Sequence, residues 1–425
     1  MVAIIVNLFI SISKSNTITY MLREEQIRLL KGLIHYQESG TNVDAGGIIQ
    51  NPSSTYTCEE RFEKEWNTFF KNYPQIVGMT GDLPEPGTFF TREDFGMPLL
   101  ATRDEKGNFR AFANVCAHRG VIVENEAKGK KVKFSCPFHG WTYNNSGKLI
   151  GIPKPDHFGE IDKSCYGLTE LPCLEKYGFL WVHPSPKGDI DLDALFDKRL
   201  KDDLEAWGFQ NLVLTHEEEY ITEMNWKLAI DTFGETYHFS VLHKDSLFND
   251  FHGNVQMFDT FKRNARLTLC TRNIDVMKLE PEEDWHICKG AFPVYYFFPN
   301  IILNVSGEGI ILVREYPLDN SPHRSVSKVS FYFWPHVIEN LKELGIDPSN
   351  IEENDTAQAN DIHPYSGFGA IIRDEDYVAA AASHKGLRAG TLDFTTFGKN
   401  EPALHHYHNT YREALDLDPL PLIKI

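Results

Sequence analysis

Two Cys-His pairs in close succession constrain the fold of this chain more than any other feature. Cys116-Ala-His118 is followed, 18 positions after its histidine, by Cys136-Pro-Phe-His139. Both pairs lie in a run of short alternating segments separated by Gly and Asn/Asp turns, which predicts small β-hairpins. A glycine follows soon after each histidine, where a loop has to curl tightly. We therefore expect two hairpin tips to bring two thiols and two imidazoles together.

Length, charge and cysteine content narrow the class of protein. At 425 residues, with 42% hydrophobic and 24% charged residues, the chain is long enough for two or three domains. The net charge of −18 argues against nucleic acid and suits cationic small molecules or a partner with a basic patch. Seven scattered cysteines favour free thiols in a reducing compartment over a disulfide framework, so we expect a cytoplasmic protein.

The N-terminus contains a short apolar run, Val2 to Ile10. No basic residue precedes it, no small-residue cleavage site follows it, and it is too short to cross a bilayer. Helical periodicity starts at Met21 and predicts an amphipathic helix over 21–36. Met21 is therefore a candidate for the true start, with a short membrane-associating peptide as the alternative. No other segment predicts a membrane contact.

Changes in pattern predict three regions. Residues 1–57 form an N-terminal extension with the first helix and a linker rich in Gly, Asn and Ser over 41–54. Residues 58–187 contain a second helix, 58–73, and then a compact all-β unit. Residues 188–425 mix strands and helices.

The third region predicts an α+β domain with an internal cavity, because its strands precede one long helix over 374–387. Asp374 is suited to cap that helix. Its candidate strands lie at 212–222, 294–306, 309–318 and 325–335.

The two Cys-His pairs permit two kinds of metal site. Thiolates suit ferric iron in a cluster, and imidazoles leave a second iron less negative, which raises its reduction potential. A structural zinc site is the alternative, but zinc commonly takes Cys-x2–4-Cys and His-x3–5-His pairs. Cys and His are mixed within each pair here, which favours a [2Fe–2S] cluster.

The strings NVCAHRG and CPFHGWTYNNSGKLIGIP resemble the Rieske domain of aromatic-ring-hydroxylating and related non-haem iron oxygenases. The resemblance implies that Cys116 and Cys136 hold one iron of the cluster while His118 and His139 hold the other.

Two departures from respiratory Rieske proteins predict a low reduction potential. The disulfide of those proteins cannot form, because its positions hold Val121 and Phe138. Trp141 stands where they carry a small hydroxyl residue, which removes a hydrogen bond to sulfur.

A second candidate metal site lies in MNWKLAIDTFGETYHFSVLH, residues 224–243, which contains Glu235, His238 and His243. Two histidines and one carboxylate with open positions form the facial arrangement that activates oxygen at ferrous iron. Glu235 and His238 lie three apart, on one helical face. His238 and His243 lie five apart, so they converge only if the helix ends or bulges between them. Either histidine alone is more often an ordinary core or surface residue.

This segment also resembles the NWK…E-x2-H-x4-H signature of the same oxygenases. The resemblance implies that His238 and His243 bind a mononuclear Fe(II). Glu235 then stands where the family's bridging acid links His238 to His139 of the partner subunit. Most aromatic dioxygenases carry Asp there, and Glu is found in, though not confined to, oxygenases acting on quaternary ammonium compounds. Asp231 matches a nearby polar position to which no role is assigned.

The third iron ligand should be a carboxylate far along the chain. IIRDEDYVAAAASHKGL, residues 371–387, resembles the family segment that opens the C-terminal helix. Asp376 fits best by its distance from His384, and Asp374 and Glu375 are the alternatives.

The resemblance implies an all-β Rieske domain followed by a helix-grip (START-like) catalytic domain, in which an antiparallel sheet surrounds a long C-terminal helix. The implied function is that of an oxygenase component, which hydroxylates or N-demethylates a small substrate with O2. No nucleotide fingerprint is present, so NAD(P)H acts only through a separate flavin/iron–sulfur reductase or ferredoxin. Transfer between subunits implies an oligomer, and the family's chains are usually trimers.

For the substrate, we favour a quaternary ammonium compound. The reasons are Glu235, the acidic surface and an aromatic-rich strand (Phe292, Tyr295, Tyr296, Phe297, Phe298), because aromatic faces attract such cations. Aromatic strands are more often plain core. The alternatives are ring hydroxylation by a dioxygenase or, in a different class, an electron-transfer or ligand-binding protein with an inactive mononuclear site.

Overall fold

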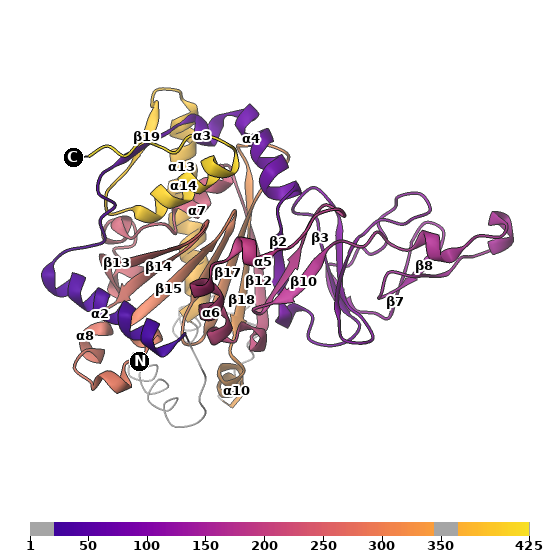
Figure 1. Ribbon diagram of the computed structural model, residues 1–425, viewed down its shortest axis with the longest axis horizontal. Helices are drawn as coiled ribbons and strands as arrows, with labels where there is room; N and C mark the ends of the chain where they lie inside the picture. The colour runs from indigo at the N-terminus through magenta and orange to yellow at the C-terminus, as the bar shows by residue number, and fades with distance from the viewer. Residues whose placement is uncertain (1–20, 344–363, 425) are drawn as a thin grey trace.

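The computed structural model describes residues 21–343 and 364–424. The prediction about Val2 to Ile10 therefore lies outside the described residues. Figure 1 shows a larger body, in which an antiparallel sheet is covered by helices, and a smaller β-rich module that projects from it. This arrangement confirms the predicted α+β fold with an all-β first domain.

The predicted N-terminal helix is α2 (Arg23–Ser39). Its Leu29, Leu30 and Leu33 are buried, at the spacing of one helical face, and Gly40 ends it in a left-handed conformation with φ of 65°. The second helix is α4 (Glu59–Glu65), continued by a π-helical turn over Trp66–Lys71.

The prediction that residues 41–54 form a linker is partly wrong. It contains β1 (Ile49–Pro52) and leads into a short helix, α3 (Ser54–Thr57). β1 pairs with β19 (Phe394–Phe397) near the other end of the chain. Local composition does not reveal this strand, because its partner lies so far away in sequence.

The β-rich module consists of three small antiparallel sheets. In Figure 1 the sheet of β7 and β8 lies at the outer end of the molecule. The first sheet contains, in sheet order, β5 (Phe109–Ala113), β4 (Leu99–Arg103), β3 (Thr88–Arg92) and β6 (Lys128–Lys130). The second contains β7 (Lys133–Ser135), β8 (Thr142–Asn144) and β9 (Leu149–Gly151). The third contains β10 (Cys173–Lys176), β11 (Phe179–Val182) and β2 (Gln75–Met79).

The larger body is built on a seven-stranded antiparallel sheet. Its central strands are buried along their whole length, because helices cover one face of the sheet and further elements cover the other. In sheet order the strands are β12 (Val213–Thr222), β18 (Ser325–Phe333), β17 (Gly309–Pro317), β16 (Ile301–Val305), β15 (Ala291–Phe297), β14 (Asn264–Thr271) and β13 (Phe251–Phe261).

The predicted long helix is longer than expected. It is one continuous helical run made of α12 (Pro364–Ile371), a π-helical turn (Ile372–Asp376) and α13 (Tyr377–Arg388). Asp374 therefore lies inside the run, so the prediction that it caps the helix is wrong. The remaining helices are α5 (Leu192–Leu195), α6 (Lys198–Trp207), α7 (Trp226–Asp231), α8 (Ile274–Met277), α9 (Ile287–Gly290), α10 (Pro335–Glu343) and α14 (Pro402–Ala414).

Besides β1 and its partner β19, larger elements missed in the sequence include β13, β14 and α14. α14 contains three buried polar side chains, His405, His408 and Thr410, which hide its amphipathic pattern. Across the described residues, no helix has both the length and the apolar character needed to cross a bilayer.

Candidate active site

The two Cys-His loops have the same backbone closure although their spacings differ. In the first, Cys116 N–H donates to Val121 O at 2.8 Å and Gly120 N–H donates to Cys116 O at 2.9 Å. In the second, Cys136 N–H donates to Trp141 O at 2.8 Å and Gly140 N–H donates to Cys136 O at 3.0 Å. Both glycines have positive φ, as such tight loops require. The chain therefore presents two matched loops side by side.

The side chains of these loops fit a Rieske cluster. Cys116 and Cys136 are buried, whereas His118 is half-buried and His139 is exposed. The two imidazole rings meet edge to face, with centroids 4.6 Å apart. Backbone N–H groups of Phe138 and His139 point at the Cys136 sulfur. Two thiols inside and two imidazoles outside are the donor set that such a cluster takes.

Tyr143 is a functional candidate that the sequence analysis missed. Its hydroxyl lies 3.3 Å from Cys116 Sγ and accepts the Ala117 N–H at 3.0 Å. Trp141, two residues earlier and directly before β8, is buried like Tyr143 and stacks on the His118 ring, with ring centroids 4.9 Å apart. The period-two alternation of the strand could have identified Tyr143, because Trp141 was already recognised as facing the site.

The second site forms where α7 ends. Asn225 begins α7 by accepting the Lys227 N–H at 3.0 Å, and the helix stops at Asp231. His238 then lies in a single 3-10 turn, Tyr237–Ser240, and His243 lies in the loop beyond it. The expectation that Glu235 and His238 share a helical face is wrong, because this stretch is not α-helical. The spacing required an end or bulge between the two histidines; α7 in fact ends before both, and the 3-10 turn that contains His238 ends at Ser240, before His243.

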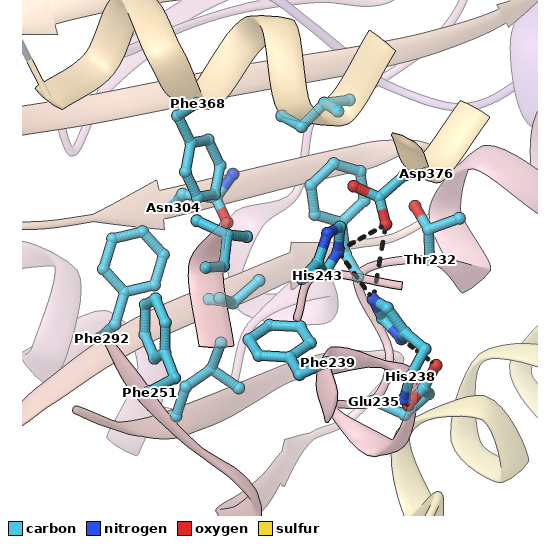
Figure 2. A pocket seen from close by; sticks show the side chains of 15 residues that line it. Thr232, Glu235, His238, Phe239, His243, Phe251, Phe292, Asn304, Phe368 and Asp376 are labelled. Carbon is cyan, nitrogen blue, oxygen red and sulfur yellow. Dashed lines mark hydrogen bonds and ion pairs between the residues drawn. The ribbon is translucent and has the colours of Figure 1, made fainter. Parts of the chain in front are cut away.

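Three side-chain atoms converge on one point in this site (Figure 2). His238 Nε2 and His243 Nε2 are 3.2 Å apart, and Asp376 Oδ1 lies 3.4 Å and 3.2 Å from them. Two ligand atoms about 2.1 Å from a metal and at right angles to each other are separated by about 3 Å. The three atoms therefore fit one face of an octahedral ion.

The π-helical turn decides which acid of the Asp374–Glu375–Asp376 run reaches this point. Asp376 is buried and faces the two histidines, as Figure 2 shows. Glu375 Oε2 accepts from His243 Nδ1 at 2.7 Å, so it orients that imidazole instead. Asp374 is exposed and pairs with Arg373. π-Turns are frequent at functional sites because they shift side chains onto another face of the helix.

Each histidine thus has its own carboxylate behind it. Glu235 Oε1 accepts from His238 Nδ1, and Glu235 Oε2 accepts the His238 N–H at 3.2 Å. Glu375 holds His243, and Ser246 Oγ donates to Glu375 Oε2 at 2.9 Å. Carboxylates on the outer nitrogens leave both Nε2 lone pairs facing the shared point, which is how metal-binding imidazoles are oriented.

The site attracts positive charge. Burial alone lowers the pKa of His238, but Asp376 and Glu235 overcome it and raise the pKa to about 9. The pKa of His243 is also raised against the effect of burial, chiefly by Asp376. Burial raises the pKa of Asp376, but the two imidazoles lower it below its ordinary value. The same negative environment favours a divalent cation, which displaces protons when it binds.

Asp231 does not reach this point. Its carboxylate accepts from Tyr56 OH at 2.6 Å and from His408 Nε2 at 2.9 Å. Together these contacts join the N-terminal segment, α7 and α14. Asp231 also lines an open depression on the outer side of Glu235, together with Glu401.

An aromatic pocket opens from the three converging atoms. The space between its lining side chains, together with the open solvent at its edge, measures about 450 Å³. The pocket is enclosed by five phenylalanines: Phe233, Phe239, Phe251, Phe292 and Phe368. The aliphatic side chains of Leu247, Leu269, Val294 and Ile372 and one amide, Asn304, complete this part of the lining. No lysine or arginine occurs among the described residues that line it.

The aromatic strand contributes less to this pocket than expected. Of its five rings only Phe292 lines the pocket. Tyr295 faces the other side of the sheet, where its hydroxyl contacts Asp203 and accepts from Trp207 Nε1 at 2.7 Å. The plain core explanation therefore holds for most of the strand.

The smaller module contains the donor set of a Rieske cluster, and the larger body contains a pocket with two histidines and one carboxylate. Together they define an iron protein in which a cluster delivers electrons to a separate iron. Comparison with known proteins agrees. Residues 74–175 match the Rieske [2Fe–2S] domain, and residues 209–417 match the catalytic domain of the ring-hydroxylating alpha subunit. The chain belongs to the Rieske non-haem iron oxygenases, as their catalytic subunit, and binds a [2Fe–2S] cluster and a mononuclear iron.

Individual relatives point the same way. The chain is 31% identical over 196 residues to the glycine betaine monooxygenase oxygenase subunit of Chromohalobacter salexigens, an alignment that covers 46% of this chain and 43% of that protein. It is 23% identical to choline monooxygenase of Beta vulgaris, over 91% of this chain and 81% of that one. A quaternary ammonium Rieske monooxygenase in complex with L-carnitine shares the fold at 19% identity, with a TM-score of 0.68 over 86% of this chain and 96% of that one.

Proposed function

We propose that this chain uses O2 to hydroxylate or oxidatively N-demethylate a small substrate, with electrons from a separate reductase. The observation that carries the proposal is the convergence of His238, His243 and Asp376 at the mouth of an otherwise apolar pocket. A facial triad leaves open positions for O2 beside a substrate.

His238, His243 and Asp376 would hold Fe(II), and the bound iron would supply the activation of O2. The surrounding residues orient the ligands and keep bulk water out. Glu235 and Glu375 fix the two imidazoles, and Phe239 packs edge to face against both rings. A dry pocket protects the reaction from unproductive side reactions.

Cys116, Cys136, His118 and His139 would hold the cluster, with the histidine side facing out. The exposed His139 and its neighbour Phe138, which is 54% exposed, present that edge to a partner. Respiratory Rieske sites have more hydrogen bonds to sulfur, so we expect the low potential of the oxygenase kind.

Electron transfer between subunits is the next part of the proposal. In Figure 1 the hairpin of β7 and β8 lies at the far end of the molecule from α7 and α13. Glu235 lines an acidic outer depression with Asp231 and Glu401, and Arg119 lies beside Phe138 at the Rieske tip. Complementary charges and exposed apolar side chains favour docking of the tip over Glu235 in a homotrimer.

The partners implied outside the oligomer are a flavin/iron–sulfur reductase or ferredoxin, which would relay electrons from NAD(P)H. None of the seven cysteines forms a disulfide, and two of them would hold the cluster, which supports a reducing compartment such as the cytoplasm.

A quaternary ammonium compound remains the favoured substrate class. The named relatives act on betaine, choline and carnitine, and the ring faces of the pocket can attract an ammonium group. Ring hydroxylation of an aromatic compound is the second candidate, because the same phenylalanines can enclose a neutral ring.

Single-turnover oxidation by the chemically reduced protein tests the proposal without the unknown reductase. Panels of ammonium and aromatic compounds would be offered with O2. We expect stoichiometric product and about three irons per chain. About two irons and no product would instead support an electron-transfer or ligand-binding protein.

Glu235→Ala tests the proposed bridge. In saturating Fe(II) both iron sites should stay occupied, while oxidation of the cluster by O2 and substrate slows by at least about a hundredfold. Wild-type kinetics in this variant would remove Glu235 from the electron path.

A further inference from the structure

Asn304 is an unusual residue within the apolar part of the pocket. It lies on β16, opposite Val294 of β15 and Ile311 of β17, and is 1% exposed. Neither its amide nitrogen nor its amide oxygen makes a hydrogen bond with any residue in the described part of the chain. Figure 2 shows its amide at the end of the pocket bordered by Phe292 and Phe368, away from the three converging atoms.

Two other buried asparagines are satisfied, and Asn145, whose oxygen has no partner, still donates through its nitrogen to the Arg103 carbonyl at 3.5 Å; Asn304 makes neither kind of bond. Asn225 donates to the carbonyls of Tyr56 and Pro322, and its oxygen accepts the Lys227 N–H. Asn264 likewise bonds through both its nitrogen and its oxygen. A buried amide without partners destabilises a fold, so its presence needs another reason. A ligand that completes its hydrogen bonds supplies one.

The charges of the pocket lining limit which ligands can bind beside Asn304. The described residues that line the pocket include no lysine or arginine. A substrate carboxylate would be buried without a cationic partner, in a pocket that already contains Asp376 and Glu235. Burying an unpaired charge is costly, and like charges repel. An ammonium group meets ring faces and negative charge instead.

We propose that Asn304 is the polar anchor of the substrate, and that the substrate is an N-methylated ammonium compound with one uncharged hydrogen-bonding group, such as a hydroxyl, and no carboxylate. The inference rests on the proposed oxygenase function and narrows it to one substrate class.

The position of Asn304 also sets which carbon is oxidised. If the hydroxyl binds Asn304, the N-methyl groups lie toward His238, His243 and Asp376. A methyl C–H bond is broken and a C–O bond forms with one atom of O2. The other oxygen atom leaves as water, taking two electrons from the reductase and two protons. The hydroxymethyl ammonium product then loses formaldehyde and a proton, leaving the dimethylamine.

Three probes of similar size test the anchor by calorimetric titration of the iron-loaded protein. Choline offers a hydroxyl, glycine betaine offers a carboxylate, and tetramethylammonium offers neither. We expect choline to bind at least about tenfold more tightly than glycine betaine. Asn304→Leu should weaken choline binding by about tenfold and leave tetramethylammonium unchanged.

Thr268→Val is the matched control. Thr268 is buried and its hydroxyl has no hydrogen-bond partner among the described residues, but it does not line the pocket. Its replacement should leave the binding of all three probes unchanged. Tighter binding of glycine betaine than of choline, or choline binding that survives Asn304→Leu, would overturn the inference.

Single turnover with choline separates this inference from the proposed function. Formaldehyde and dimethylaminoethanol are the expected products, and an aldehyde formed at the hydroxyl carbon would overturn the inference. If choline binds through Asn304 yet no product forms with any compound, the anchor stands and the oxygenase proposal fails.

Discussion

The Rieske site and the mononuclear site differ in how far along the chain their residues lie. The four Rieske residues fall between Cys116 and His139, on two loops that each close on themselves. The mononuclear site joins His238 and His243 to Asp376, more than a hundred positions later. The Rieske site depends mainly on two local turns. The mononuclear site requires α7 and the helical run of α12 and α13, which contains Asp376, to pack correctly on one sheet.

This difference also explains their exposure. Hairpin tips project from a sheet, so the imidazoles of the Rieske loops face outward. Residues gathered between a sheet and a helix are enclosed by both, so His243 and Asp376 are buried. A site that hands on electrons needs an exposed edge, and a site that activates O2 needs a closed pocket.

The largest effect should come from removing the distant ligand. Asp376→Ala should lower the iron content from about three to about two per chain while leaving the visible spectrum of the cluster unchanged, because only the mononuclear site loses a ligand. Asp374→Ala, at an exposed neighbour, is the control and should retain all the iron. Loss of the cluster spectrum in Asp376→Ala would show that the two sites are not independent.

A smaller effect is expected from the carboxylate behind His243. Glu375→Gln should weaken Fe(II) binding by about 10- to 100-fold, because such outer partners orient the ligand and raise its basicity. Titration of the iron-depleted protein measures this directly. Asp374→Asn should leave the affinity unchanged, and an equal loss in both variants would point to general damage of the π-turn.

The packing beneath the catalytic helix should respond to pH. Glu315 is fully buried, with Ser327 and Tyr377 donating to its two oxygens at 2.6 Å. Burial raises its pKa from 4.5 to about 8. The folded protein therefore keeps a proton that the unfolded chain loses, and this contribution to stability disappears as pH rises from 4.5 to about 8.

Glu315→Gln, which cannot ionise, should remove that pH dependence. Between pH 5 and pH 8 the free energy of unfolding of the wild type should fall by about 3.5 kcal/mol relative to that of Glu315→Gln. Urea denaturation at the two pH values measures this. Parallel pH profiles for the two proteins would show that Glu315 is ionised in the folded state.

The smallest effect should appear at the Rieske site. Tyr143→Phe removes a hydroxyl from Cys116 Sγ and should lower the cluster midpoint potential by about 50 mV, because hydrogen bonds to sulfur favour the reduced form. Tyr166→Phe is the control, since Tyr166 packs on Trp141 at 5.7 Å. An unchanged midpoint in Tyr143→Phe would exclude a functional hydrogen bond.

The sequence by itself determined the chemistry of the Rieske loops, because all four donors and their glycines lie in one short segment. The five-residue spacing also predicted that helical geometry is interrupted between His238 and His243; in the structure α7 already ends at Asp231, before both histidines. The domain boundaries at 57 and 187 stay a prediction.

Tertiary structure decided the rest. A family resemblance favoured Asp376 over Asp374 and Glu375, but only the π-turn shows what each of the three acids contacts, because adjacent carboxylates look alike until the helix fixes their directions. Only the packed sheet shows that Asn304 faces the pocket and Tyr295 does not. Side-chain direction across a layered domain depends on partners far away in sequence, and local patterns do not contain that information.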